Sequence, residues 1–211
     1  MPSAHIYPLS RLVHAGPRAW QRMLEEIEEG SSYAFSYYLP MREAVVQFCS
    51  SRGHGRDQIV REMTTRARTS ARLGRGDRLR DNTNAFETFE VVFYPKIRRF
   101  RRSLLHEKQD GYDFEGLTLL GAPHFEADDS AGRRRYAFLH AAKWSDDDLA
   151  AYLELLSIVV EEGYGADSRN LWIMDLRKGE DIRWRSSARM RRRCRDTAML
   201  YAKLVNAIGT E

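Results

Sequence analysis

The sequence has 211 residues, of which 43% are hydrophobic and 30% are charged, and its formal net charge is +4. This length and composition are typical of one globular domain with a sizeable core. No apolar run is long enough to cross a bilayer, and the segment "MPSAHIYPLSRLVHAGPRAW" lacks the pattern of a secretion signal. We therefore expect a cytoplasmic protein without membrane contact.

The placement of cysteine and arginine in the sequence indicates which structural sites and binding partners to expect. Cys49 and Cys194 are far apart and form no CxxC pair, so the sequence predicts neither a zinc ribbon nor a disulfide framework. Arginine is concentrated in "RTSARLGRGDRLR", "KIRRFRR" and "RSSARMRRRCR". Guanidinium groups match phosphate geometry, so these segments indicate a nucleic-acid partner. The alternative is a set of solvated helix faces that pair with carboxylates.

Amphipathic helices are predicted over 17–30, 41–55 and 56–73. In the first helix, apolar residues recur every three or four positions between Pro17 and Gly30, which are typical start and stop residues. Pro40 interrupts the aromatic segment that precedes the second helix. After the third helix, the segment "GRGDRLRDNTN" breaks the helical pattern.

The most aromatic stretch, 84–105, is predicted as a helix that bends or breaks before Pro95. Its apolar residues return every three or four positions, and a basic segment from Arg98 to Arg102 surrounds its end. The polar, glycine-containing segment 106–116 is predicted as a loop.

The period of the pattern changes at Leu117. The segments "LTLLGAPHFEA" and "RRYAFLHAAKW" are rich in strand-forming residues, and "DDSAGR" between them has hairpin chemistry. A helix is predicted after Ser145, which is a suitable N-cap, and it ends near Gly163. Strand, tight turn and strand follow over 169–184, and a long amphipathic helix covers 186–208.

This order of elements predicts a mixed α/β fold. A mainly helical N-terminal portion, residues 1–114, is expected to pack on a small mixed sheet flanked by helices, formed by residues 115–211. We expect the two portions to form one compact domain.

The C-terminal portion resembles the RecB-like branch of the PD-(D/E)XK nuclease superfamily. In that family a strand ending in G-x-x-D leads through a hairpin to a strand ending in (D/E)-x-K, followed by a helix and a strand similar to "v-x-D-L-x-x-G". This chain has "GAPHF" at 121–125, "HAAKW" at 140–144, a predicted helix at 145–162 and "LWIMDLRKGEDIRW" at 171–184. The resemblance implies a restriction-endonuclease-like core.

The catalytic positions of the family are altered in this chain. Carried over residue by residue, the two acids fall on His124 and Ala141, and the lysine falls on Lys143. Mg²⁺ prefers carboxylate oxygens, so the resemblance implies a degenerate active site. Glu126 shares a strand face with His124, so a rebuilt site of His124, Glu126, Lys143 and a helix glutamate is a further hypothesis, with Mn²⁺ accepting the imidazole.

An upstream helix in the family often supplies another acid, and Glu87 or Glu90 matches that place. The simpler interpretation of each is a solvent-facing helix carboxylate, and that of His124 is a hydrogen-bonded structural residue.

Three functions are consistent with these residues. The first is a degenerate nuclease-fold protein that binds DNA, or serves as a subunit of a nucleic-acid-processing, defence or mobile-element complex, without cutting and without a cofactor. The second is an active Mg²⁺- or Mn²⁺-dependent deoxyribonuclease in which Glu126 has replaced the lost acid. The third is a structural subunit whose arginines meet acidic protein surfaces. For the first, the predicted phosphate contacts are Arg98, Arg99, Arg101, Arg102, Arg191, Arg192 and Arg193.

Overall fold

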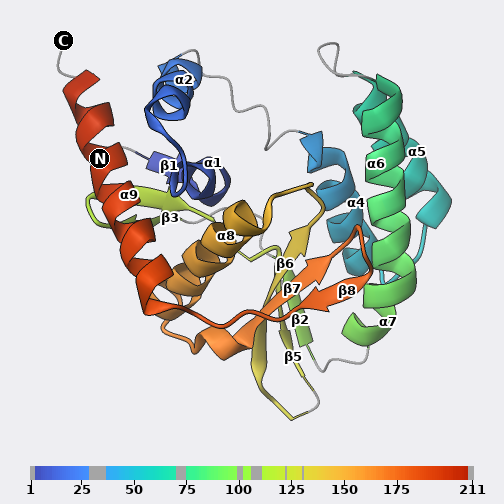
Figure 1. The fold of residues 1–211 in the computed structure, drawn as a ribbon. Helices are drawn as coiled ribbons and strands as arrows, with labels where there is room; N and C mark the ends of the chain where they lie inside the picture. Colours follow the sequence, from blue (N-terminus) through green and yellow to red (C-terminus); the bar gives the residue numbers. More distant parts are fainter. Residues whose placement is uncertain are drawn as a thin grey trace.

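The computed structural model describes residues 3–28, 37–69, 75–98, 102–105, 111–121, 123–129 and 131–208. Helices cover both faces of a central sheet, and a second, smaller sheet lies at one side (Figure 1). The predicted mixed α/β class is therefore confirmed. Among these residues, no helix is both long enough and apolar enough to cross a membrane.

The central sheet has five strands in the order β2 (Arg102–Leu105), β5 (Phe125–Asp128), β6 (Arg134–His140), β7 (Leu171–Asp175) and β8 (Glu180–Ile182). β6 and β7 are parallel, with His140 opposite Asp175, and the other pairs are antiparallel. Parallel neighbours need a crossover, and here α8 (Asp146–Ile158) makes it. Consequently β6 and β7 both end at the same edge of the sheet.

The smaller sheet contains β1 (Ser3–His5), β4 (Leu117–Leu120) and β3 (Gly111–Phe114), in that order. β1 is parallel to β4, and β3 joins β4 through a tight turn in which Glu115 and Gly116 have φ values of 53° and 78°. Strands from residues 1–114 thus hydrogen-bond to strands of the predicted C-terminal portion.

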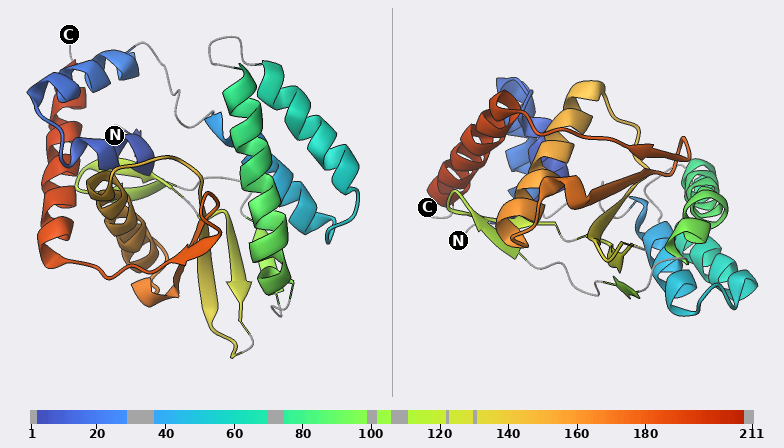
Figure 2. Two further views of the ribbon diagram at one scale, coloured as in Figure 1. Left: turned by 45° about the vertical axis from the view of Figure 1, so that its right-hand side comes forward. Right: turned by 90° about the horizontal axis from the view of Figure 1, so that it is seen from below.

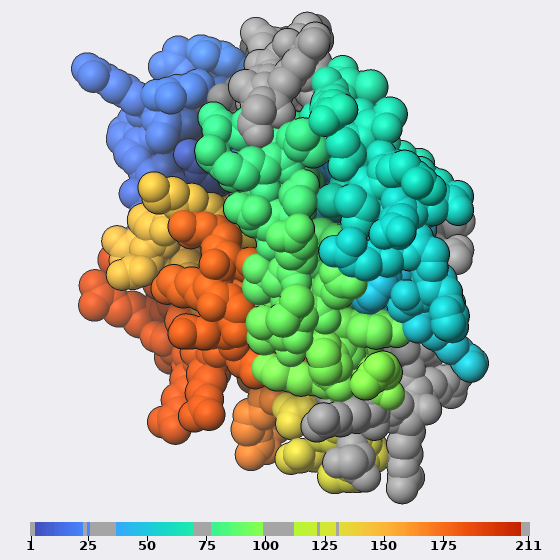
Figure 3. Space-filling model, turned by 90° about the vertical axis from the view of Figure 1, so that its right-hand side faces the viewer, coloured from blue at the N-terminus to red at the C-terminus, as the bar shows by residue number. Residues whose placement is uncertain are grey.

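Two layers of helices enclose the central sheet. One layer contains α1 (Ile6–Leu12), α2 (Pro17–Glu28), α8 and α9 (Ala188–Ile208), and the other contains α4 (Leu39–Ser50), α5 (Arg56–Thr69), α6 (Arg75–Thr88) and α7 (Tyr94–Ile97). The view from below shows the sheet between these layers (Figure 2). α5 and α6 form much of the outer surface of the second layer (Figure 3).

The side chains of β6 explain why its sequence is almost continuously apolar. Tyr136 and Phe138 belong to the core cluster formed with α8 and α9, whereas Ala137 and Leu139 belong to the cluster formed with α4 and α6. A strand with helices on both faces has no solvent-facing side, so its pattern does not alternate between apolar and polar residues.

Several predicted elements differ from the structure. The break predicted at 74–84 is wrong, because α6 begins at Arg75. Asn82 is fully buried in that helix, where its side chain accepts a hydrogen bond from Met41 N and donates to Tyr37 O. The buried face of α6 therefore includes a hydrogen-bonded polar side chain. For this reason its sequence lacks the apolar periodicity from which a helix is predicted.

The strand content was also underestimated. The single strand predicted at 117–127 is two strands, β4 and β5, in different sheets, and Arg102–Leu105 is strand β2 where a helix was predicted. The predicted loop 106–116 contains β3, and its residues 106–110 lie outside the described residues. The predicted bend near Pro95 coincides with a π-helical segment, Phe89–Phe93, followed by α7.

Candidate functional site

A pocket of about 290 Å³ lies where β6 leads into α8. β6 and β7 both end there, and crevices at the carboxyl ends of parallel strands are common ligand sites in α/β proteins. α1 and α8 lie on one side of these strands and α4 on the other (Figure 1). The pocket is lined by Tyr7, Arg11, Tyr37, Tyr38, Arg42, Leu139, His140, Ala141, Ala142, Lys143, Trp144 and Tyr152.

The charges of this lining are all of one sign. Arg11, Arg42 and Lys143 contribute three cations, and no carboxylate lines the pocket among the described residues. Ala141, the position where the predicted resemblance would require an acid, is buried within the core cluster beneath α4 and α6. A methyl group, and not a metal-binding oxygen, therefore stands two positions before the exposed Lys143.

Arg42 is the innermost of the three cations. It interacts electrostatically with Tyr7 of α1 and Tyr152 of α8, so it reaches from α4 toward both helices. Burial lowers the pKa of Arg42, but arginine has a reference value so high that the group stays protonated at neutral pH. A cation in a poorly solvated position interacts more strongly with an anion than one on the open surface does.

Aromatic rings form two walls of the pocket. On the α1 and α8 side, the ring centroid of Trp144 lies 4.7 Å from that of Tyr7 and 4.6 Å from that of Tyr152. On the α4 side, the centroids of Tyr37 and Tyr38 are 4.8 Å apart. Both groups have edge-to-face geometry, which fixes the ring orientations. The pocket therefore combines cations with rigid apolar surfaces.

Two histidines border this region as neutral groups. Burial lowers the pKa of His140 to about 4, and it holds the pKa of His124 well below its ordinary value, with the charge of Arg42 acting in the same direction. His124 Nδ1 accepts a hydrogen bond from Leu139 N at 3.1 Å, so this side chain links the residue before β5 to strand β6. His124 is thus engaged as a structural residue.

The structure does not bring the predicted acids to Lys143. Glu126 pairs with Arg134, with 2.9 Å between Oε2 and Nη1, and it lies opposite Tyr136 in the sheet. Lys143 follows Tyr136 by seven positions, and the four positions from Tyr136 to the end of β6 alone span roughly 13 Å. Glu126 and Lys143 therefore lie toward opposite ends of β6.

The helix acids point to another part of the molecule. Glu90 accepts two hydrogen bonds from Arg56 Nε, at 2.7 and 2.8 Å, and the exposed Glu87 also interacts with Arg56. Asp175, at the end of β7, caps the following turn by accepting hydrogen bonds from the backbone N–H groups of Arg177 and Lys178. Within the described residues, no three His, Cys, Asp or Glu side chains gather closely enough to hold a metal ion.

The predicted phosphate-binding arginines occupy different environments. Arg191 pairs with the fully buried Glu154 and with Glu161, so its guanidinium is engaged inside the fold. Arg192 and Arg193 are both exposed, and Arg193 Nη1 lies 3.3 Å from His14 Nδ1.

Only two members of the second predicted group belong to the described residues. Arg98 is exposed after α7, and Arg102 begins β2. Arg99 and Arg101 lie outside the described residues. Arg98 is not part of the described lining of the pocket.

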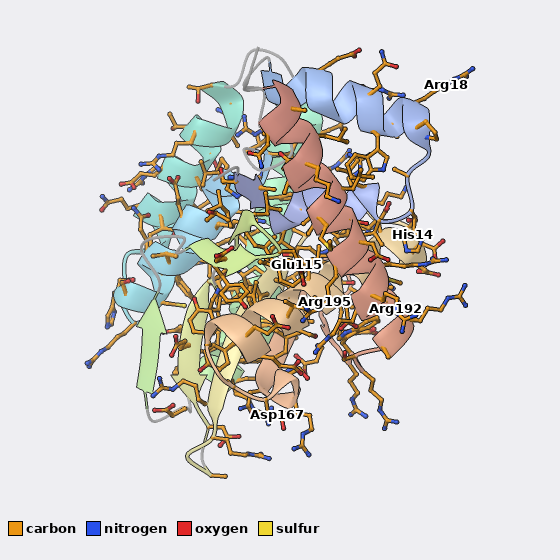
Figure 4. All side chains as sticks on the ribbon, turned by 90° about the vertical axis from the view of Figure 1, so that its left-hand side faces the viewer. His14, Arg18, Glu115, Asp167, Arg192 and Arg195 are labelled. Atoms are coloured by element: carbon orange, nitrogen blue, oxygen red, sulfur yellow. The ribbon has the colours of Figure 1, made fainter. Side chains whose placement is uncertain are left out.

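A separate group of exposed arginines surrounds the start of α9. No ion pair joins any of them to a carboxylate of the described chain, and we call this group the α9 ridge. Its members are Arg183, Arg185, Arg189 and Arg192. In Figure 4, Arg192 points outward from α9, whereas Arg195 turns toward Glu115, with which it forms an ion pair.

Sequence reasoning found Lys143 but missed Arg11, Arg42, Tyr38 and Tyr152. Arg42 had a detectable signal, since it is the only cation among the apolar residues of "LPMREAVVQF". The chain matches no known family model, and comparisons with curated proteins and with solved structures find no match.

Proposed function

We propose that this chain binds a nucleic-acid strand, most simply DNA, through a phosphate group in the pocket at the end of β6, and that it does not cut the strand. The observation that carries this proposal is the lining of the pocket, where Arg11, Arg42 and Lys143 are accompanied by no carboxylate from the described residues.

The charge of the lining favours an anion over a metal ion. Mg²⁺ sites in nucleases need carboxylate oxygens, and a cluster of cations would repel the ion. Guanidinium and ammonium groups bind phosphate directly through charge-assisted hydrogen bonds. The loss of acids at His124 and Ala141 is therefore consistent with a site converted from metal binding to direct phosphate binding.

The same geometry argues against cleavage. Hydrolysis in the resembling family requires acids beside the lysine, and here Glu126, Glu87 and Glu90 are directed elsewhere and engaged with arginines. The α9 ridge supports the choice of a polyanionic partner, because its exposed arginines pair with no carboxylate of the described residues and match a phosphate backbone. Its contribution to affinity is expected to depend on salt but not on base sequence.

Fluorescence anisotropy with a single-stranded DNA oligonucleotide, in EDTA, tests this proposal. We expect binding without any metal and an affinity that falls steeply between about 50 and 200 mM salt. The double substitution Arg11→Met and Lys143→Met should weaken binding about a hundredfold, since each charged hydrogen bond contributes roughly 1.5 kcal/mol at the lower end of its range, or about tenfold in affinity. The matched control is Arg18→Met, an exposed arginine on α2 outside the pocket lining.

Parallel incubation with Mg²⁺ or Mn²⁺ tests the absence of cleavage. Cleavage products that disappear in the Glu126→Gln variant would favour the nuclease hypothesis and overturn the proposal. No measurable affinity at low salt would also overturn it, and would favour a structural subunit that contacts acidic protein surfaces.

A further inference from the structure

We infer that the pocket at the end of β6 takes one terminal nucleotide, with its monoester phosphate on the cations and its base against the aromatic walls. This inference rests on the proposed function and narrows it from a strand to the end of a strand. A free nucleoside monophosphate has the same chemistry and is a second source of the same ligand.

The size of the pocket favours a single nucleotide. Its volume of about 290 Å³ lies near the lower end of the roughly 300–1,000 Å³ typical of small-molecule pockets. Its walls come from α1, the start of α4, the end of β6 and α8, so they surround the space from several directions. A single terminal unit therefore fits better than a continuous segment of several nucleotides.

The charge of the pocket distinguishes a terminal phosphate from an internal one. A phosphate monoester carries about −1.5 to −2 charges at pH 7, whereas an internal phosphodiester carries one. Three cations, Arg11, Arg42 and Lys143, match the higher charge better. Arg42 is half-buried, with its Nε shielded from solvent, while Arg11 and Lys143 are exposed, so the phosphate would be bound between inner and outer cations.

The aromatic walls provide a surface for the base. Tyr38, at the start of α4, and Trp144, after β6, are both half-buried and belong to separate ring groups on opposite sides of the strands. Stacking of a base on a protein ring is sequence-tolerant, because every base has a π-face. We therefore expect little preference among the bases.

Competition binding tests the inference with strands that differ only at their ends. A 3′-labelled probe with a 5′-phosphate is displaced by unlabelled competitors of one sequence: linear with a 5′-phosphate, linear with a 3′-phosphate, linear with hydroxyl ends, and circular. We expect a phosphorylated linear strand to compete about tenfold better than the hydroxyl-ended or circular strand, the difference expected for one charged hydrogen-bonding group. The better of the two phosphorylated strands identifies the end that binds, and displacement by a nucleoside monophosphate identifies the free ligand.

Substitution of Tyr38 tests the stacking surface. Tyr38→Leu should weaken binding of the phosphorylated strand about tenfold, whereas Tyr38→Phe, which keeps the ring, should bind like the wild type. Comparison of the two variants separates loss of the ring from loss of the hydroxyl, and thermal melting confirms that both are folded.

The outcomes separate this inference from the proposed function. Equal competition by the circular and phosphorylated linear strands would overturn terminal recognition while leaving strand binding intact. Equal binding by the Tyr38→Leu variant would overturn stacking on this wall. Failure of every strand to bind at low salt would overturn the proposed function as well.

Discussion

Acidification should destabilise this protein because His140 is held neutral inside the fold. Burial lowers its pKa to about 4, with Arg177 acting in the same direction and Asp175 opposing it. In the unfolded chain the pKa of the imidazole returns to about 6.5. The unfolded state therefore binds more protons between these values, so stability falls as the pH decreases from about 6.5 toward 4.

The two pKa values give the size of this effect. When the pH falls from 7 to 5, protonation of His140 in the unfolded state lowers the free energy of unfolding by about 2 kcal/mol. His124 adds to the loss in the same direction, since its pKa is also lowered by burial. Urea denaturation of the wild type at the two pH values measures the total.

The His140→Phe variant isolates the contribution of this residue. Phenylalanine preserves an aromatic ring beside Trp144, whose centroid lies 5.4 Å from the imidazole, and it cannot be protonated. The variant should lose about 2 kcal/mol less stability than the wild type over the same pH interval. The same substitution at the exposed His54 controls for loss of an imidazole. Equal pH dependence of wild type and His140→Phe would refute the reasoning.

Three further substitutions test individual interactions within the fold by urea denaturation. Glu154→Ala should lower the free energy of unfolding by about 1–3 kcal/mol, because it removes the buried carboxylate that accepts hydrogen bonds from Ser186 Oγ and Arg191 Nε, while Arg191 keeps its ion pair with Glu161. Unchanged stability of Glu154→Gln, which keeps the size of the side chain and removes its charge, would show that the charge is not the cause. Gly121→Ala should lower the free energy of unfolding by about 1–3 kcal/mol, because a Cβ atom there would overlap the Ile6 side chain. An unchanged free energy of unfolding would contradict this packing. Ser145→Ala should lower the free energy of unfolding by about 1 kcal/mol, because Ser145 Oγ accepts a hydrogen bond from Asp148 N in the first turn of α8. Unchanged stability would show that water replaces this hydrogen bond.

Local patterns predicted the part of the fold that depends on neighbouring residues. Ser145 was identified as an N-cap, and the structure confirms the hydrogen bond from Asp148 N at 3.2 Å. The hairpin at 128–133 is also confirmed: Asp129 accepts backbone hydrogen bonds from Ala131 and Arg133. These interactions span four residues or fewer, so composition and spacing were sufficient to predict them.

Contacts between distant segments explain what the sequence did not reveal. β4 and β5 are separate strands because β4 pairs with β1, more than a hundred residues earlier in the chain. Helix α6 depends on the hydrogen bond between Asn82 and Met41 N, which no periodic pattern records. The pocket has the same origin: Arg42 and Lys143 are about a hundred residues apart in sequence, and only the fold brings them together.

The indole N–H signals of the four tryptophans provide the most direct measurement of the central claim. Trp144 lines the pocket, whereas Trp20, Trp172 and Trp184 do not belong to its described lining. We expect titration of ¹⁵N-labelled protein with a single-stranded DNA oligonucleotide, in EDTA, to shift the Trp144 signal, identified by its loss in Trp144→Phe. Binding detected by anisotropy while the Trp144 signal stays in place would contradict phosphate binding in the pocket.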